Sequence, residues 1–87
     1  MVKVLFYSLL WERLGKPFVV VKGDCRMEEL LERVVKKTGA DRSLFFKSGE
    51  INKSYIMLLN GKSVTFDREA FVKDSDEVSV IPILTGG

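Results

Sequence analysis

The sequence predicts an α+β fold, in which a mixed β-sheet is covered on one face by one main helix. Three observations lead to this prediction. Short segments rich in β-branched and aromatic residues recur from residue 2 to residue 83. One segment, over residues 26–38, carries apolar residues at helical spacing. An Asn-Gly pair at residues 60–61 separates two apolar runs, which is the strongest short-range signal of a hairpin.

Two strands are expected in the first quarter of the chain, over residues 2–7 and 17–22. Alternation along the first strand places two sets of side chains on opposite faces, Val2, Val4 and Phe6 on one and Lys3, Leu5 and Tyr7 on the other. Pro17 suits the first position of the second strand, where a missing N–H is tolerated. Residues 8–16 are expected to form the connecting loop, closed by Gly15.

The main helix is predicted over residues 26–38. Its apolar stripe consists of Met27, Leu30, Leu31, Val34 and Val35. Acidic residues fall in its first turn and lysines in its last, as the helix dipole favours. Asp24 or Cys25 is the expected N-cap, and Gly39 the residue that ends the helix.

The second half of the chain should complete the sheet. Residues 41–54 are irregular, with a short helical turn expected around residues 44–46. A strand over residues 55–59, the Asn60-Gly61 turn and a partner strand over residues 62–64 form the predicted hairpin. A polar turn over residues 74–77 precedes the last strand, residues 78–83. The expected order is therefore β-β-α-β-β-β in a single domain, residues 1–87.

Composition excludes several kinds of site and partner. The chain has no histidine and one cysteine, so zinc sites with several Cys or His ligands, imidazole bases and intrachain disulfides are all excluded. A formal net charge of +2 is too small to indicate nucleic acid as the main partner. No apolar run approaches the roughly 18 residues that cross a bilayer. We therefore expect a cytoplasmic protein with no membrane association and no bound metal.

The sequence ends in Leu84-Thr85-Gly86-Gly87, which directly follows the last predicted strand. We expect residues 84–87 to form an extended, flexible tail, and without Cβ atoms its two glycines can enter a narrow channel. The reactive group of this tail is the α-carboxylate of Gly87, which is inert toward acyl transfer until adenylation supplies a good leaving group. Sulfide or a thiol could then displace AMP. The alternative is a frayed terminus without function.

Four segments carry a resemblance to a known family. They are Val4-Leu5-Phe6-Tyr7-Ser8 followed by residues 10–15, Leu59-Asn60-Gly61-Lys62, Asp76-Glu77-Val78, and Pro82 through Gly87. On these segments the chain resembles the MoaD-like small subunit of molybdopterin synthase, within the ThiS/MoaD group of sulfur carriers. The resemblance covers nearly the whole chain and implies a β-grasp (ubiquitin-like) fold.

The resemblance also implies a function. An E1-like adenylyltransferase of the MoeB or ThiF type would activate Gly87 with ATP and magnesium, and a sulfur donor would convert it to a thiocarboxylate. A large subunit of the MoaE type, in a heterotetramer, would use that sulfur to make molybdopterin. The chain would bind no cofactor and would not be catalytic alone. The alternatives are a protein modifier joined to lysines through Gly87, a carrier for tRNA thiolation or thiamine, and an interaction module.

A docking face follows from strand alternation combined with the resemblance. If Val78 and Val80 face the helix, Ser79, Ile81 and Ile83 face outward. The ubiquitin-like precedent also turns Leu58 outward. The predicted partner-binding residues are Leu5, Tyr7, Leu58, Ile81, Ile83, Leu84 and Thr85. The alternative is that a loop or residues 41–54 cover this face.

Three weaker signals leave alternatives open. Cys25 near a helix N-terminus could be a reactive thiol or an incidental one. The basic residues Arg33, Lys36, Lys37 and Arg42 near Phe45 and Phe46 could bind phosphate or nucleic acid, or could simply be a solvated helix end. The apolar group Leu9, Leu10, Trp11 and Leu14 could be a flap over the core or a partner contact.

Overall fold

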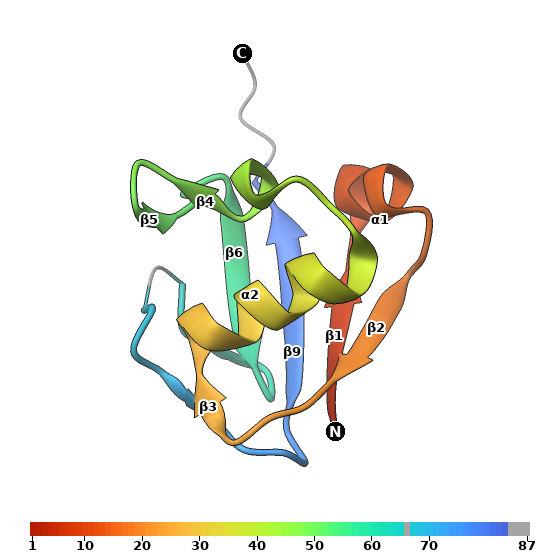
Figure 1. The fold of residues 1–87 in the computed structure, drawn as a ribbon. Helices are drawn as coiled ribbons and strands as arrows, with labels where there is room; N and C mark the ends of the chain where they lie inside the picture. The colour runs from red at the N-terminus through yellow and green to blue at the C-terminus, as the bar shows by residue number, and fades with distance from the viewer. Residues whose placement is uncertain (66, 84–87) are drawn as a thin grey trace.

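The chain folds around a five-stranded sheet, with the longer helix lying across one face (Figure 1). The computed structural model describes residues 1–65 and 67–83. In chain order the elements are β1 (Val2–Phe6), α1 (Ser8–Leu14), β2 (Phe18–Val21), β3 (Cys25–Arg26), α2 (Met27–Thr38), η1 (Arg42–Leu44), β4 (Phe46–Lys47), β5 (Glu50–Ile51), β6 (Tyr55–Leu59), β7 (Lys62–Ser63), β8 (Phe71–Val72) and β9 (Glu77–Pro82).

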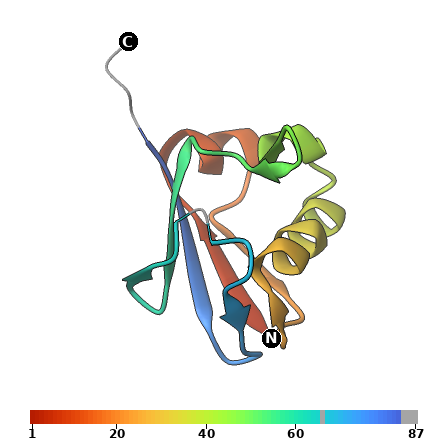
Figure 2. The same ribbon diagram turned by 90° about the vertical axis from the view of Figure 1, so that its left-hand side faces the viewer.

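The order of strands in the main sheet is β2-β1-β9-β6-β7. Strands β1 and β9 are parallel, and the other neighbours are antiparallel. Two short pairs, β3 with β8 and β4 with β5, lie outside this sheet. Seen from the side, the sheet and α2 form two layers (Figure 2). The predicted mixed sheet under one main helix, a β-grasp fold, is confirmed.

The core lies between α2 and the sheet, where alternate strand residues meet the apolar stripe of the helix. The fully buried side chains include Val4, Phe6, Met57, Val78 and Val80 from the sheet and Leu30, Leu31 and Val34 from α2. The ring of Phe45, which follows η1, is buried in the same core. Its centroid lies 6.4 Å from that of Phe6 and 6.2 Å from that of Tyr55. This arrangement confirms the predicted inward faces of β1, α2 and β9.

Helix α2 begins one residue later than predicted, and neither predicted N-cap serves it. Arg26 is the N-cap residue, because Cys25 and Arg26 pair with β8 as strand β3. The first amides of the helix, Met27 N and Glu28 N, donate to the carbonyl oxygens of Ala70 and Arg68 at 2.8 and 3.1 Å. Backbone from a distant part of the chain therefore satisfies groups that a capping side chain would otherwise satisfy. The predicted end is correct, since Gly39 has a φ of 72°.

Residues 8–16, predicted to be a loop, contain helix α1. Leu10 and Leu14 lie four residues apart and face the core, whereas Leu9 and Trp11 are exposed. Because apolar residues occur on both the buried and the exposed side of this helix, the sequence shows no clear apolar stripe with a helical period. Gly15, with a φ of 73°, ends the helix and donates its N–H to the Trp11 carbonyl. Within residues 1–65 and 67–83, no helix has both the length and the apolarity to cross a bilayer.

The hairpin between β6 and β7 forms as predicted. Asn60 and Gly61 both have positive φ angles, 51° and 86°, as a two-residue hairpin turn requires. The Asn60 side chain also accepts a hydrogen bond from Glu77 N and donates one to Asp76, both at 2.9 Å. The turn is thereby tied to the start of β9.

Candidate interaction site at the end of the sheet

The last strand holds the chain in the sheet as far as Ile83. Pro82 lies opposite Tyr55 in the register of β6 and β9, and Ile83 N donates to the carbonyl oxygen of Ser54 at 2.7 Å. The predicted reactive residues Gly86 and Gly87, with Leu84 and Thr85, lie outside the described residues. The structure places Ile83, the residue before them, at the end of central strand β9.

Apolar side chains predominate on the face of the sheet turned away from α2, which we call the outer sheet face. Tyr7 N donates to Val80 O, which brings Tyr7 beside Ile81, and Ile81 pairs with Ile56 on the other side. The apolar residues of the outer sheet face are Leu5, Tyr7, Phe18, Val20, Ile56, Leu58, Ile81 and Ile83, and the polar residues Lys3 and Ser79 lie among them. The predicted residues Leu5, Tyr7, Leu58, Ile81 and Ile83 are thus brought together, and all are half-buried or exposed.

Sequence reasoning missed three members of this face. Phe18, Val20 and Ile56 are 41%, 37% and 38% exposed. Alternation within residues 17–22 and 55–59 would have identified them, because their neighbours Val19, Val21 and Met57 are buried. Residues 41–54 do not cover the face, since β4 and β5 lie on the same side of the sheet as α2 (Figure 2).

A polar cleft of about 600 Å³ lies beside the point where the last strand ends. Its lining includes Arg13, Asp41, Asn52, Ser54 and Tyr55. Tyr55 is 7% exposed, and burial raises the pKa of its hydroxyl, while the positive charge of Arg13 opposes that rise. Hydrogen bonds from the backbone and side chain of Ser43 lower the pKa of Asp41. The cleft therefore offers both donors and acceptors to polar groups of a partner.

The family of the chain follows from a comparison of its sequence with family models. The ThiS family model matches residues 4–87, a span that includes the two C-terminal glycines. The chain belongs to the ThiS family. No protein with a curated description matches this ThiS-family chain.

Several solved structures share the fold of this ThiS-family chain. Small archaeal modifier protein 1 (SAMP1) from Methanosarcina acetivorans has 27% identity and a TM-score of 0.80 over 99% of this chain and 95% of that chain. CysO in the BexX/CysO complex of Amycolatopsis orientalis has 24% identity and a TM-score of 0.84, with both chains fully covered. A putative molybdopterin converting factor, subunit 1, from Pyrococcus furiosus has 23% identity and a TM-score of 0.62, over 95% of this chain and 97% of that chain.

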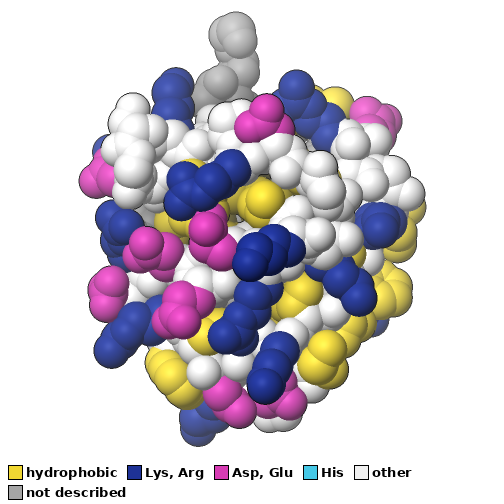
Figure 3. Space-filling view, viewed as in Figure 1, with side chains coloured by type: hydrophobic (Ala, Val, Ile, Leu, Met, Phe, Trp, Pro, Cys, Tyr) yellow, Lys and Arg dark blue, Asp and Glu magenta, His cyan; other side chains and the backbone are white. Residues whose placement is uncertain are grey.

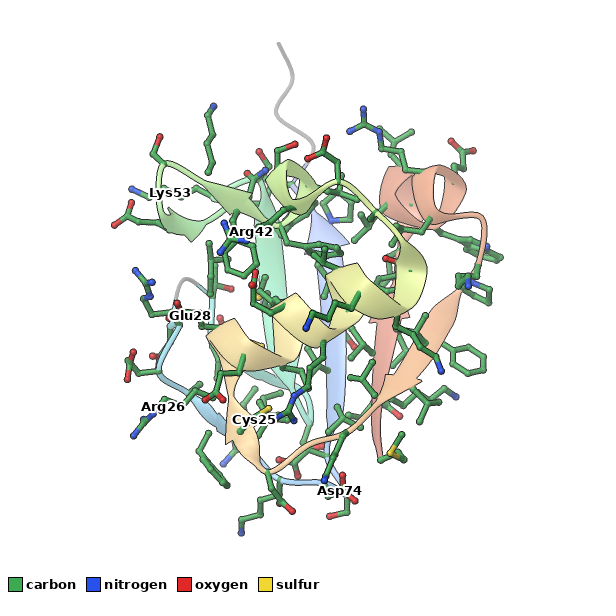
Figure 4. All side chains as sticks on the ribbon, in the orientation of Figure 1. Cys25, Arg26, Glu28, Arg42, Lys53 and Asp74 are labelled. Carbon is green, nitrogen blue, oxygen red and sulfur yellow. The ribbon has the colours of Figure 1, made fainter. Side chains whose placement is uncertain are left out.

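The only cysteine of this ThiS-family chain lies in surroundings that disfavour the thiolate. Cys25 is 3% exposed and belongs to β3, where it pairs with Val72 of β8 (Figure 4 shows Cys25 beside the start of α2). Burial raises the pKa of its thiol, outweighing the lowering effect of the Arg33 charge. The expectation of a lowered thiol pKa is therefore wrong, and the structure favours the alternative of an incidental, buried thiol. Within residues 1–65 and 67–83, no group of three or more His, Cys, Asp or Glu residues could hold a metal ion.

The basic residues that the sequence grouped together are divided in the fold. The Arg42 guanidinium lies 4.4 Å from the ring centroid of Phe46 and pairs with Glu32 at 2.7 Å. Arg33 instead donates to the carbonyl oxygens of Lys22 and Gly23, at 2.8 and 2.9 Å. Arg33, Lys36 and Lys37 therefore lie beside the end of β2, away from the aromatic residues.

Proposed function

We propose that the chain is a sulfur carrier that donates sulfur for molybdopterin synthesis from a thiocarboxylate formed at Gly87. The observation that carries the proposal is the match to the ThiS family, which runs through Gly86 and Gly87. The fold agrees with it, because central strand β9 ends at Pro82, a few residues before the two glycines.

The chemistry requires an activating partner. A Gly87 carboxylate oxygen attacks the α-phosphorus of ATP, and the P–O bond to the β-phosphate breaks, giving an acyl adenylate and pyrophosphate. Sulfide then attacks the acyl carbon, and the bond to AMP breaks, so that the product is a thiocarboxylate with sulfur in place of one oxygen. ATP and magnesium are bound by the E1-like partner. The chain itself has no histidine to act as a base.

The outer sheet face is the proposed docking surface for this partner. It is apolar, and it reaches Ile83, the residue directly before the tail. A partner that buries this face would receive Leu84, Thr85 and the glycines at a fixed point of entry. The E1-like enzyme and a MoaE-type large subunit would use the same face in turn, since both must receive the same tail.

Intact-mass measurement tests the carrier proposal. The chain is incubated with a MoeB-type or ThiF-type enzyme, ATP and a sulfur donor. We expect a mass gain equal to the exchange of one oxygen for one sulfur, and no gain in a variant that lacks Gly87. Absence of the gain with several active enzymes would overturn the proposal.

The molybdopterin assignment has its own test. The thiocarboxylated chain is mixed with a MoaE-type large subunit and the pterin precursor of molybdopterin, and the loss of sulfur from the chain is followed by mass. Transfer to the pterin is expected. Retention of the sulfur would assign the chain to another sulfur pathway, such as tRNA thiolation or thiamine synthesis.

A second candidate function is protein modification. Its support is the 27% identity, over nearly the full length, to a protein named as a small archaeal modifier. The same acyl adenylate, attacked by a lysine amine in place of sulfur, would give an isopeptide bond to Gly87. Tagged chain expressed in cells would then appear in conjugates that survive thiol reductants, and these would be lost in a Gly87 deletion.

A further inference from the structure

Strand β2 forms an edge of the main sheet that no other strand described in the structure covers. Phe6 N donates to Pro17 O at 2.8 Å, which fixes which residues of β2 face β1. In an antiparallel pair the bonded positions alternate, so Val19 and Val21 bond to β1, while the amides and carbonyls of Phe18 and Val20 point to the open edge. The edge therefore offers donors and acceptors to an added strand.

The edge is also apolar and accessible. Phe18 and Val20 are partly exposed, and Val20 and Val21 line a notch of about 340 Å³ between β2 and α2. Four consecutive residues of β2, Phe18 to Val21, are aromatic or β-branched, a composition that favours strand pairing. An extended apolar segment fits this notch better than a helix would, because only a strand can satisfy the free backbone groups.

Positive charge surrounds the notch. Lys22, Arg33, Lys36 and Lys37 line it, and none of them belongs to the salt bridges of residues 1–65 and 67–83. The hydrogen bonds of Arg33 to the carbonyls of Lys22 and Gly23 fix its guanidinium at the end of the strand. Figure 3 shows Lys and Arg side chains over α2 and hydrophobic ones along the right-hand margin, beside β2.

We propose that the β2 edge binds an extended segment of a partner protein, in which a short apolar run is flanked by acidic residues. The segment would add a strand beside β2, place alternate side chains in the notch, and pair its carboxylates with the surrounding cations. A second copy of this chain is disfavoured as the occupant, because edge-to-edge pairing would bring two clusters of positive charge together. The notch lies beside the start of β9, because Val20 pairs with Lys3 and Lys3 pairs with Glu77. It is therefore away from Ile83 and would recruit a partner independently of the tail.

A synthetic peptide tests the proposal. The probe is acetylated and amidated, with alternating valine and isoleucine flanked on both sides by aspartates, and it is titrated into the ¹⁵N-labelled chain. The largest chemical-shift changes are expected at the amides of Phe18 and Val20. A peptide with a central proline, which lacks a donor, should bind much more weakly. Absence of binding, or changes centred on Ile56 and Ile81 instead, would overturn the proposal.

A matched pair of variants tests the charge requirement. Lys36→Glu combined with Lys37→Glu should weaken peptide binding by about tenfold or more. Lys47→Glu combined with Lys53→Glu makes the same change in net charge away from β2 (Figure 4 labels Lys53). This control variant should bind the peptide with an affinity within about twofold of that of the unmodified chain. Equal losses in both variants would contradict a localised site.

Two further outcomes separate the proposal from its alternatives. Deletion of Gly87 should leave peptide affinity unchanged, so the result is independent of the carrier proposal. In the chain alone, concentration-dependent broadening at Phe18 and Val20 together with an increase in molecular mass would assign the edge to self-association and would overturn a heterologous partner.

Discussion

Gly23 occupies a position where the backbone comes too close to its neighbours for any side chain. A Cβ atom placed there would lie 2.6 Å from both the Cα atom of Asp74 and a methyl group of Val2. Gly23 N also donates to the Asp74 carboxylate at 2.8 Å, which holds the two loops together. Close approach, and not an unusual φ angle, therefore requires glycine here.

We expect Gly23→Ala to lower the free energy of unfolding by about 1–3 kcal/mol, the usual range for overpacking. Urea denaturation followed by circular dichroism measures the change. Gly49→Ala is the control, because Gly49 has a φ of 77° and an added Cβ would meet no atom within 4 Å, so only backbone strain of roughly 1 kcal/mol applies. A Gly23→Ala variant as stable as the unmodified chain would show that the two loops can separate without cost.

Asp76 links the loop before β9 to the hairpin turn. Its carboxylate accepts hydrogen bonds from the Asn60 side chain and from Lys73 N, which lower its pKa below the ordinary value of 3.8. Because the folded pKa is the lower one, the stabilisation is complete above the unfolded pKa and is lost as the pH falls through the folded pKa.

Asp76→Asn should therefore reduce the loss of stability between about pH 5 and pH 2. Urea unfolding midpoints measured across this range provide the test. Glu12→Gln on exposed helix α1 removes a carboxylate elsewhere and serves as the control. An unchanged pH profile in Asp76→Asn would mean that other carboxylates dominate acid unfolding.

The elements that the sequence predicted well are those whose pattern is local. Helix α2 has a regular apolar stripe, and β6 is bounded by the Asn60-Gly61 turn, so their predicted limits differ from the observed ones by at most one residue. The short strands β3 and β8 could not be predicted, since each exists only because the other lies beside it. The same pairing displaced the N-cap of α2 to Arg26.

A substitution in β9 tests the outer sheet face as a docking surface. Ile81→Asp should weaken binding to the E1-like partner by at least about tenfold, roughly 1.4 kcal/mol, because a charge would be buried in an apolar contact. Isothermal titration calorimetry with the purified enzyme measures this change. The native circular dichroism spectrum should persist, as Ile81 is only half-buried.

Phe71→Asp is the matched control for this substitution. Phe71 is an exposed apolar residue of β8, outside the main sheet, so its replacement should leave partner affinity unchanged. Unaltered affinity in Ile81→Asp, or an equal loss in Phe71→Asp, would exclude the outer sheet face as the docking surface.

At the scale of the whole molecule, the candidate site could be predicted only in part. Strand alternation placed Ile81 and Ile83 outward because the period of a strand is independent of its neighbours. The outward direction of Phe18, Val20 and Ile56 follows from the same alternation. Whether they join Ile81 in one continuous face depends on the strand order β2-β1-β9-β6-β7, which is a tertiary property. The open edge at β2 follows from the same order, so no local pattern indicated it.

A chain that stops at Ile83 tests whether the fold and the proposed chemistry are separate. Its thermal midpoint should stay within about 2 °C of that of the full chain, since the ladder bond from Ile83 to Ser54 is retained. Scanning calorimetry measures the midpoint, and the mass gain at Gly87 should be absent. A large drop in the midpoint would mean that residues 84–87 also stabilise the domain.

The central position of β9 has a consequence for synthesis of the protein on the ribosome. Strands β1 and β6 are joined in the sheet only through β9, which ends at Pro82. A nascent chain that has not yet released residue 82 therefore lacks the middle of its sheet, and its apolar residues stay unburied. A partner that recognises the assembled sheet is thus unable to bind a nascent chain until β9 has been synthesised and has joined the sheet.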